Sequence, residues 1–147
     1  HDRPRAWVWP LTILLSLQIV WGAFTAGLRA GHASDTWPLM FGALVPDGIL
    51  GRAIDAVSDP VSVQFIHRSL AWIAAGAVLA VAAQLWRAGG GVRALAMGGV
   101  VLAQFVLGVS VILNHVPVWL GVAHQAGAAL LVAAMVWTAH WSRRGPA

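Results

Sequence analysis

One stretch decides the fold: residues 94–142, ALAMGGVVLAQFVLGVSVILNHVPVWLGVAHQAGAALLVAAMVWTAHWS, which contain no charged Asp, Glu, Lys or Arg. A helix needs about 20 apolar residues to cross a bilayer core of about 30 Å, so the stretch is long enough for two spans. The cluster Asn114-His115-Val116-Pro117 supplies the turn that divides it. We therefore predict two membrane helices, at 93–113 and 118–141.

Two further apolar segments precede this stretch. Residues 6–28 carry no charge, and residues 61–86 are interrupted only by His67 and Arg68 near their start. They predict membrane helices at 7–28 and 61–86, joined by a long loop rich in Pro, Gly and Asp. The fold class is therefore an all-α integral membrane protein, a four-transmembrane-helix bundle whose long loop lies on the outer side.

The composition agrees with this class. Only 10% of the 147 residues are charged and 59% are hydrophobic, whereas a soluble domain has about 25% charged residues. The nine arginines do not cluster as a nucleic-acid-binding face requires, so no nucleic acid partner is expected. The absence of cysteine excludes disulfides, thiolate metal sites and iron–sulfur clusters.

Arginine placement predicts the orientation. Six arginines and Asp2 flank one end of the predicted helices (net +5), while Arg29, Arg52 and Arg68 oppose four aspartates at the other (net −1). Because cytoplasmic loops carry the excess of positive charge, both termini are expected in the cytoplasm and the 29–60 loop outside. Since the chain starts at His1 rather than Met, we interpret residues 1–147 as one four-helix domain of a longer polypeptide.

A short repeat links the two halves of the chain. Gln18–Gly22 (QIVWG) and Gln104–Gly108 (QFVLG) share the pattern Q-x-V-x-G. Each precedes a helix with a histidine near its start, His67 in one case and His124 in the other. The bundle is therefore predicted to consist of two similar helical hairpins.

The two histidines are the candidate site. Each comes six residues after the valine that starts its helix, about 9 Å below the outer surface, and the two helices run in the same direction. Imidazoles at equal depth across a four-helix bundle are typical of axial heme ligation. Zinc is disfavoured because no third ligand lies at that depth. The alternative is a heme-free scaffold or transporter subunit in which both histidines are packing residues.

Other polar residues have weaker roles. Arg68 is expected either to pair with a heme propionate or to extend to the outer surface. We interpret Gln18 and Gln104 as interhelical hydrogen-bond partners. His32 and His115 are placed in outer loops, and His140 at the inner end of the last helix.

Five motifs in this order resemble the C-terminal half of the heme A synthase family: QIVWGAFTAGLRAG (18–31), TWPLM (36–40), PDG (46–48), VQFIHR (63–68) and AHQAGA (123–128). The resemblance implies an eight-helix protein of two similar halves, an oxidoreductase that oxidises the C8 methyl of heme O to the formyl of heme A for cytochrome oxidase. It implies that His67 and His124 ligate the iron of a b-type cofactor heme, with Arg68 beside it. The inner side is the bacterial cytoplasm or the mitochondrial matrix, and the high Ala, Gly and Arg content favours a bacterial inner membrane, with the heme near the periplasmic side.

One departure from the family separates the two halves. In the family's N-terminal, substrate-handling half, a glutamate stands three residues before the first histidine, whereas here that position is Gln64. We therefore assign no catalytic residue to this chain and expect it to be inactive without an N-terminal catalytic half or an oligomer partner. The alternative is a stand-alone four-helix cytochrome b that carries electrons without modifying a substrate.

Overall fold

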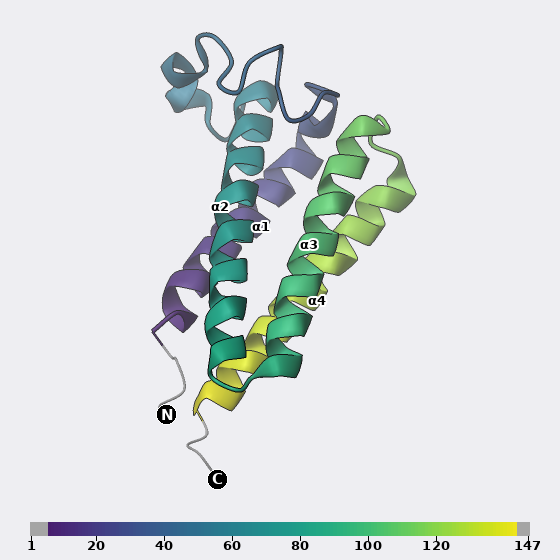
Figure 1. Ribbon diagram of the computed structural model, residues 1–147. Coiled ribbons are helices and arrows are strands. Elements are labelled where there is room, and N and C mark those ends of the chain that lie inside the picture. The colour runs from purple at the N-terminus through teal and green to yellow at the C-terminus, as the bar shows by residue number, and fades with distance from the viewer. Residues whose placement is uncertain (1–5, 144–147) are drawn as a thin grey trace.

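The computed structural model describes residues 6–143, and in that range it consists of helices and loops (Figure 1). The four long helices are α1 (Val8–Gly27), α2 (Pro60–Arg87), α3 (Gly91–Leu113) and α4 (Val118–Arg143). Each is long and apolar enough to cross a membrane, which confirms the all-α, four-span fold class. The helix ends differ by at most two residues from the ranges expected from the sequence.

The helices pack in chain order. α1 packs against α2, α2 against α3 and α3 against α4, and a smaller contact between α1 and α4 closes the bundle. α2 and α4 therefore lie diagonally opposite one another and run in the same direction, away from the long loop (Figure 1). This is the arrangement in which side chains from α2 and α4 meet inside the bundle.

The start of α2 is set by a strong capping signal. Pro60 occupies the first helical position, where its missing N–H costs nothing. The carboxylate of Asp59 accepts hydrogen bonds of 2.8 Å from both the backbone N–H and the hydroxyl of Ser62, and Arg52 lies 3.5 Å away. The two hydrogen bonds from Ser62 lower the pKa of Asp59 below its ordinary value, because they stabilise the charged form.

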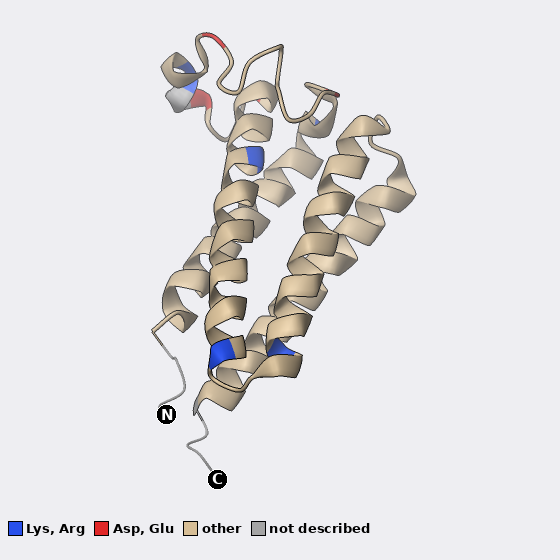
Figure 2. Ribbon diagram, viewed as in Figure 1, with Lys and Arg blue, Asp and Glu red and all other residues tan. Residues whose placement is uncertain are grey.

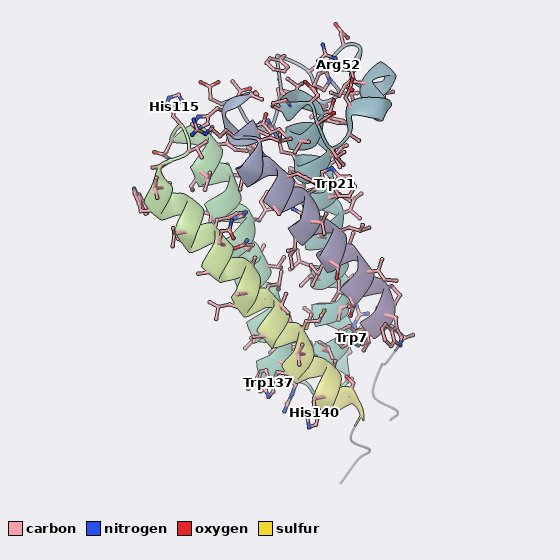
Figure 3. All side chains as sticks on the ribbon, turned by 180° about the vertical axis from the view of Figure 1, so that it is seen from behind. Trp7, Trp21, Arg52, His115, Trp137 and His140 are labelled. Carbon is pink, nitrogen blue, oxygen red and sulfur yellow. The ribbon has the colours of Figure 1, made fainter. Side chains whose placement is uncertain are left out.

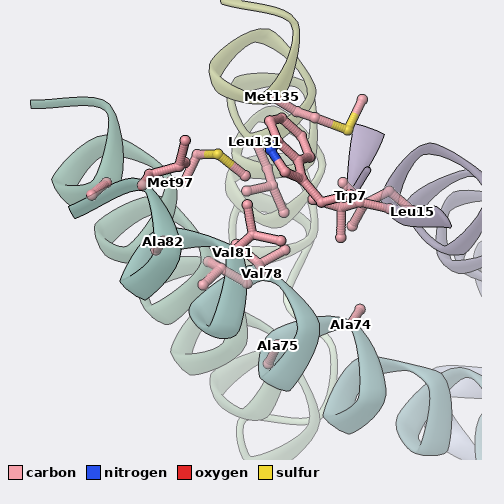
Figure 4. Packing of buried hydrophobic residues seen from close by; sticks show 14 residues of the cluster. Trp7, Leu15, Ala74, Ala75, Val78, Val81, Ala82, Met97, Leu131 and Met135 are labelled. Carbon is pink, nitrogen blue, oxygen red and sulfur yellow. The ribbon is translucent and has the colours of Figure 1, made fainter. Parts of the chain in front are cut away.

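The buried apolar cluster occupies only one half of the bundle, the half at which α1 begins and α4 ends. Figure 4 shows it in close-up. Its members come from all four helices: Trp7, Leu11, Leu15, Ala74, Ala75, Val78, Val81, Ala82, Leu85, Ala94, Met97, Val101, Leu131 and Met135. Trp7, directly before the start of α1, is turned into this cluster and is 7% exposed.

The segment between α1 and α2 covers the opposite end of the bundle. It contains two 3-10 helices, η1 (Ala30–His32) and η2 (Ile49–Asp55), the second kinked at Arg52. The sequence predicts a short amphipathic helix over 49–57, and the structure has the tighter 3-10 form there. Figure 2 shows that the described acidic residues all lie at this end, while basic residues lie near both ends.

Candidate functional site

The structure places His67 on α2 and His124 on α4, in the half of the bundle that the buried apolar cluster leaves out. α2 begins at Pro60 and α4 at Val118, so His67 lies about 10.5 Å and His124 about 9 Å from the helix ends nearest the long loop. The structure therefore places the two predicted site residues at a similar level, on helices that lie diagonally opposite one another and run in the same direction.

The apolar cluster stops at the same level on all four helices. Its last members toward the histidines are Leu15 and Val101, three residues before the repeated glutamines, and Ala74 and Leu131, seven residues after the histidines. The half of the bundle near the termini is therefore closed by packed side chains, and the histidines mark the level at which this packing ends.

The repeated Q-x-V-x-G pattern places a glycine against each imidazole. A Cβ added at Gly22 would stand 3.3 Å from Cε1 of His67, and one added at Gly108 would stand 3.0 Å from Cε1 of His124. Both distances are tighter than ordinary van der Waals contact, so each ring lies directly on a helix backbone. The glycines allow the imidazoles to lie there, and the contact occurs once in each hairpin.

The glutamines of the same repeat bind the histidine-bearing helices. Nε2 of Gln18 donates to the backbone oxygen of His67 at 3.3 Å, and Nε2 of Gln104 donates to the backbone oxygen of His124 at 2.8 Å. These contacts confirm the interpretation of both glutamines as interhelical hydrogen-bond partners. Nε2 of Gln18 also lies 3.3 Å from the ring Nδ1 of His67.

The site suits a metal held by two imidazoles. Nδ1 of His124 is buried without a hydrogen-bond partner. Because buried polar atoms are normally satisfied, this is expected of a ring that binds a ligand. No group of three or more His, Asp or Glu side chains that could hold a metal ion occurs among residues 6–143. A two-ligand site with small residues beside the rings fits a heme iron, because the porphyrin supplies the remaining four ligands.

Two side chains that flank His67 hold the long loop. Gln64, which is 1% exposed, donates through Nε2 to the backbone oxygens of Ser34 (2.8 Å) and Gly31 (3.2 Å). These bonds give Gln64 a structural role. They close the loop over the end of the bundle that contains the histidines.

Arg68 binds the next part of the loop. Its Nη2 donates to the backbone oxygens of Thr36 (2.8 Å), Pro38 (3.2 Å) and Leu39 (3.3 Å). Nη1 of the same guanidinium is buried without a partner. The side chain therefore extends toward the long loop and anchors the TWPLM motif, while Nη1 remains able to donate to an acidic ligand.

An aromatic cluster that sequence reasoning missed lies beside the site. Trp37 of the TWPLM motif stacks on Trp72 of α2, with ring centroids 5.7 Å apart, and Phe105 of α3 contacts Trp72 edge-on at 4.7 Å. Trp72 follows His67 by five residues and Phe105 follows Gln104 directly. The only signal in the sequence was the tryptophan within a motif that carried the family resemblance.

The three other histidines within residues 6–143 lie away from the pair. His32 and His115 line an open pocket of about 300 Å³ at the loop end, where Nδ1 of His115 lies 3.6 Å from the carboxylate of Asp35. Figure 3 shows His115 at that end of the bundle and His140 at the other, near Trp137. The structure therefore brings neither His115 nor His140 to the two candidate ligands.

Comparisons with known proteins point to one family. The family described as cytochrome oxidase assembly protein matches residues 1–136. The chain is 41% identical over 148 aligned residues to the heme A synthase of Rhodospirillum centenum, covering 96% of this chain and 39% of that protein. It is 40% identical to the heme A synthase of Rhizorhabdus wittichii (94% and 41%) and 41% identical to that of Maricaulis maris (89% and 40%).

The chain thus spans about two fifths of the length of the curated relatives it matches. No solved structure matches it. The family match over most of the chain, the identity near 40% and the four apolar helices agree with the resemblance that the five motifs carry. The chain belongs to the cytochrome oxidase assembly family that contains the heme A synthases.

Proposed function

We propose that this chain is the C-terminal, cofactor-binding half of a heme A synthase, in which His67 and His124 ligate a b-type heme. The observation that carries the proposal is the repeated pairing of each histidine with a glycine and a glutamine of the neighbouring helix. Polar side chains inside a membrane are costly, so two imidazoles with such dedicated surroundings indicate a binding site. When bound, a b-type heme supplies a one-electron carrier.

The chain's own residues would hold, seal and shield that group. His67 and His124 would supply the axial nitrogens, and Gly22 and Gly108 leave room for the rings against the neighbouring helix backbones. The packed half of the bundle keeps water out from one side, and the loop fastened by Gln64 and Arg68 covers the other. The unpartnered Nη1 of Arg68 would donate to a heme propionate.

The oxidation of the heme O methyl group belongs, in this proposal, to the whole synthase. The position three residues before His67 is occupied by Gln64, whose amide carries no charge and is already used to bind the loop. We therefore assign electron transfer to this half and substrate chemistry to an N-terminal half or an oligomer partner. With both termini cytoplasmic, the heme lies toward the periplasmic side of a bacterial inner membrane.

The test is optical spectroscopy of the protein purified in detergent. Reduced-minus-oxidised spectra of the wild type are expected to show a sharp low-spin b-type signal, which His67→Ala and His124→Ala each abolish. His140→Ala, at the far end of α4, is the matched control and retains the signal. A spectrum that is unchanged in both site variants would remove the assignment of these ligands.

A second arm separates the synthase from a stand-alone cytochrome b. Membranes of a bacterium that lacks its own heme A synthase are supplied with the complete polypeptide, and their hemes are extracted and separated. Heme A formation that depends on His67 supports the proposal. Heme b binding without any heme A identifies an electron carrier instead.

A further inference from the structure

The two imidazoles are not held in the same way, although the repeat surrounds them with the same residue types. Gln18 and Gln104 occupy equivalent positions, and each donates to the backbone oxygen of its histidine. Only the amide of Gln18 reaches the ring as well, with Nε2 3.3 Å from Nδ1 of His67. Nδ1 of His124 is buried without a partner.

A hydrogen bond to one ring nitrogen determines which nitrogen of the imidazole is available to bind a metal. A neutral imidazole has one N–H and one bare nitrogen, and the nitrogen bound to a metal must be the bare one. The partner of the other nitrogen therefore selects the tautomer and orients the ring. For His67 that other nitrogen is Nδ1, which leaves Nε2 for the iron.

A glutamine amide suits this task because it carries both a donor and an acceptor. Nε2 of Gln18 faces a bare Nδ1 in the metal-free arrangement, and Oε1 of the same amide is buried without a partner. Turning the amide over breaks its bond to the backbone oxygen of His67, brings Oε1 to Nδ1 and lets Oε1 accept the N–H that ligation through Nε2 requires. The same side chain then serves both states of the ring.

We propose that Gln18 is a positioning residue that fixes Nδ1 of His67 and directs Nε2 to the iron, and that it makes the two axial ligands inequivalent. The inference rests on the proposed function, in which both histidines are ligands. It goes further by assigning an asymmetry to a pair that the sequence repeat makes look equal. Gln18 touches no substrate and acts only through His67.

The repeat provides the matched control. Gln18→Leu removes the ring contact together with a bond to a backbone oxygen, whereas Gln104→Leu removes the backbone bond alone. A merely structural role predicts the same outcome for both variants. Gln18→Glu restores an acceptor for the Nδ1–H and is the conservative variant. All are made in the natural polypeptide and studied in membranes.

The first readout needs no heme. Solid-state ¹⁵N spectra of the histidine-labelled apoprotein are assigned to His67 by their loss in His67→Ala. We expect a single neutral tautomer in the wild type and in Gln104→Leu, and a mixture of both in Gln18→Leu. Identical His67 spectra in wild type and Gln18→Leu would overturn the proposal.

The second readout uses the heme-loaded protein. Gln18→Leu is expected to weaken heme binding about 10–100-fold, as loss of such partners typically does. It should also raise the midpoint potential, because a less basic imidazole stabilises the ferric iron less. Gln18→Glu should lower the potential below that of the wild type. Equal shifts in Gln18→Leu and Gln104→Leu would overturn the proposal.

The two readouts distinguish a failure of this inference from a failure of the proposed function. A wild type without any bis-histidine signal would refute heme ligation, while the apoprotein spectra would still decide whether Gln18 sets the tautomer of His67. If Gln18→Leu does not fold, Gln18→Met, which keeps the length of the side chain without its hydrogen bonds, takes its place with the same expected outcomes.

Discussion

Gly108 and His124 are in such close contact that a Cβ on the glycine would lie 3.0 Å from Cε1 and 3.6 Å from both ring nitrogens of the imidazole. The ring of a residue on α4 therefore rests on the backbone of α3. Gly22 bears the same relation to His67 at 3.3 Å, with slightly more room. These two contacts set how deep each imidazole lies in the bundle, and any side chain at either glycine has to displace a ring.

We expect Gly108→Ala to disturb the site more than Gly22→Ala. The added methyl must push the His124 ring away, and this overpacking should destabilise the protein by about 1–3 kcal/mol. Alanine stabilises a helix by roughly 1 kcal/mol relative to glycine, so the net effect is expected to be destabilising. The measurement is the low-spin heme spectrum together with the thermal midpoint.

Gly99→Ala is the control for this prediction, because a Cβ at Gly99 meets nothing within 4 Å. It should leave the heme spectrum unchanged and preserve or raise the thermal midpoint. A Gly108→Ala protein with a wild-type spectrum would contradict the contact between Gly108 and the imidazole.

Gln64→Leu is expected to loosen the loop over the site. The substitution leaves the backbone oxygens of Gly31 and Ser34 without their donor, and an unsatisfied buried polar group costs about 1–3 kcal/mol. Limited proteolysis of the 28–59 segment should become faster. Gln84→Leu, an exposed position at the far end of α2, should leave the cleavage rate unchanged.

The cap at Asp59 should make stability depend on pH in a defined direction. The folded-state pKa of Asp59 lies below its ordinary value of 3.8, so the stabilising effect is complete above 3.8 and is lost as pH falls through the lower, folded-state pKa. Removing the cap in Asp59→Ala should cost about 1 kcal/mol at neutral pH.

The measurement compares the unfolding of wild type, Asp59→Ala and Asp59→Asn from pH 6 downward. Asparagine also caps helices but does not titrate, so the difference between wild type and Asp59→Asn should shrink below pH 3.8. A difference that grows as the pH falls would show that the carboxylate does not stabilise the start of α2.

Arg93→Leu should destabilise the end of the bundle opposite the long loop. The Arg93 guanidinium lies 4.6 Å from the ring centre of Trp137 and 4.9 Å from that of Trp141, which joins the start of α3 to the end of α4. Loss of these cation–π contacts should lower the free energy of unfolding by about 0.5–2 kcal/mol. Arg93→Lys keeps the cation and should retain part of that energy, which thermal unfolding in detergent would resolve.

Several features of the site were predictable because they depend on local spacing. The distance of His67 and His124 from the starts of their helices follows from counting residues, since the rise of a helix is constant. The Q-x-V-x-G repeat marked the helices that would contact them. The partners of Gln64 and Arg68 were not predictable, because they lie about 30 residues away on a loop without a periodic pattern.

The sequence by itself determined the four spans and the level of the histidine pair, because bilayer thickness and helix rise turn apolar length directly into structure. Only the tertiary structure decided that Trp7 turns into the packed half, that Trp37 stacks on Trp72, and that Gln18 reaches an imidazole which its counterpart Gln104 does not. Two copies of one motif look identical as letters. Their side chains differ in reach because a contact between two helices depends on the tertiary packing around it, which a five-residue motif does not encode.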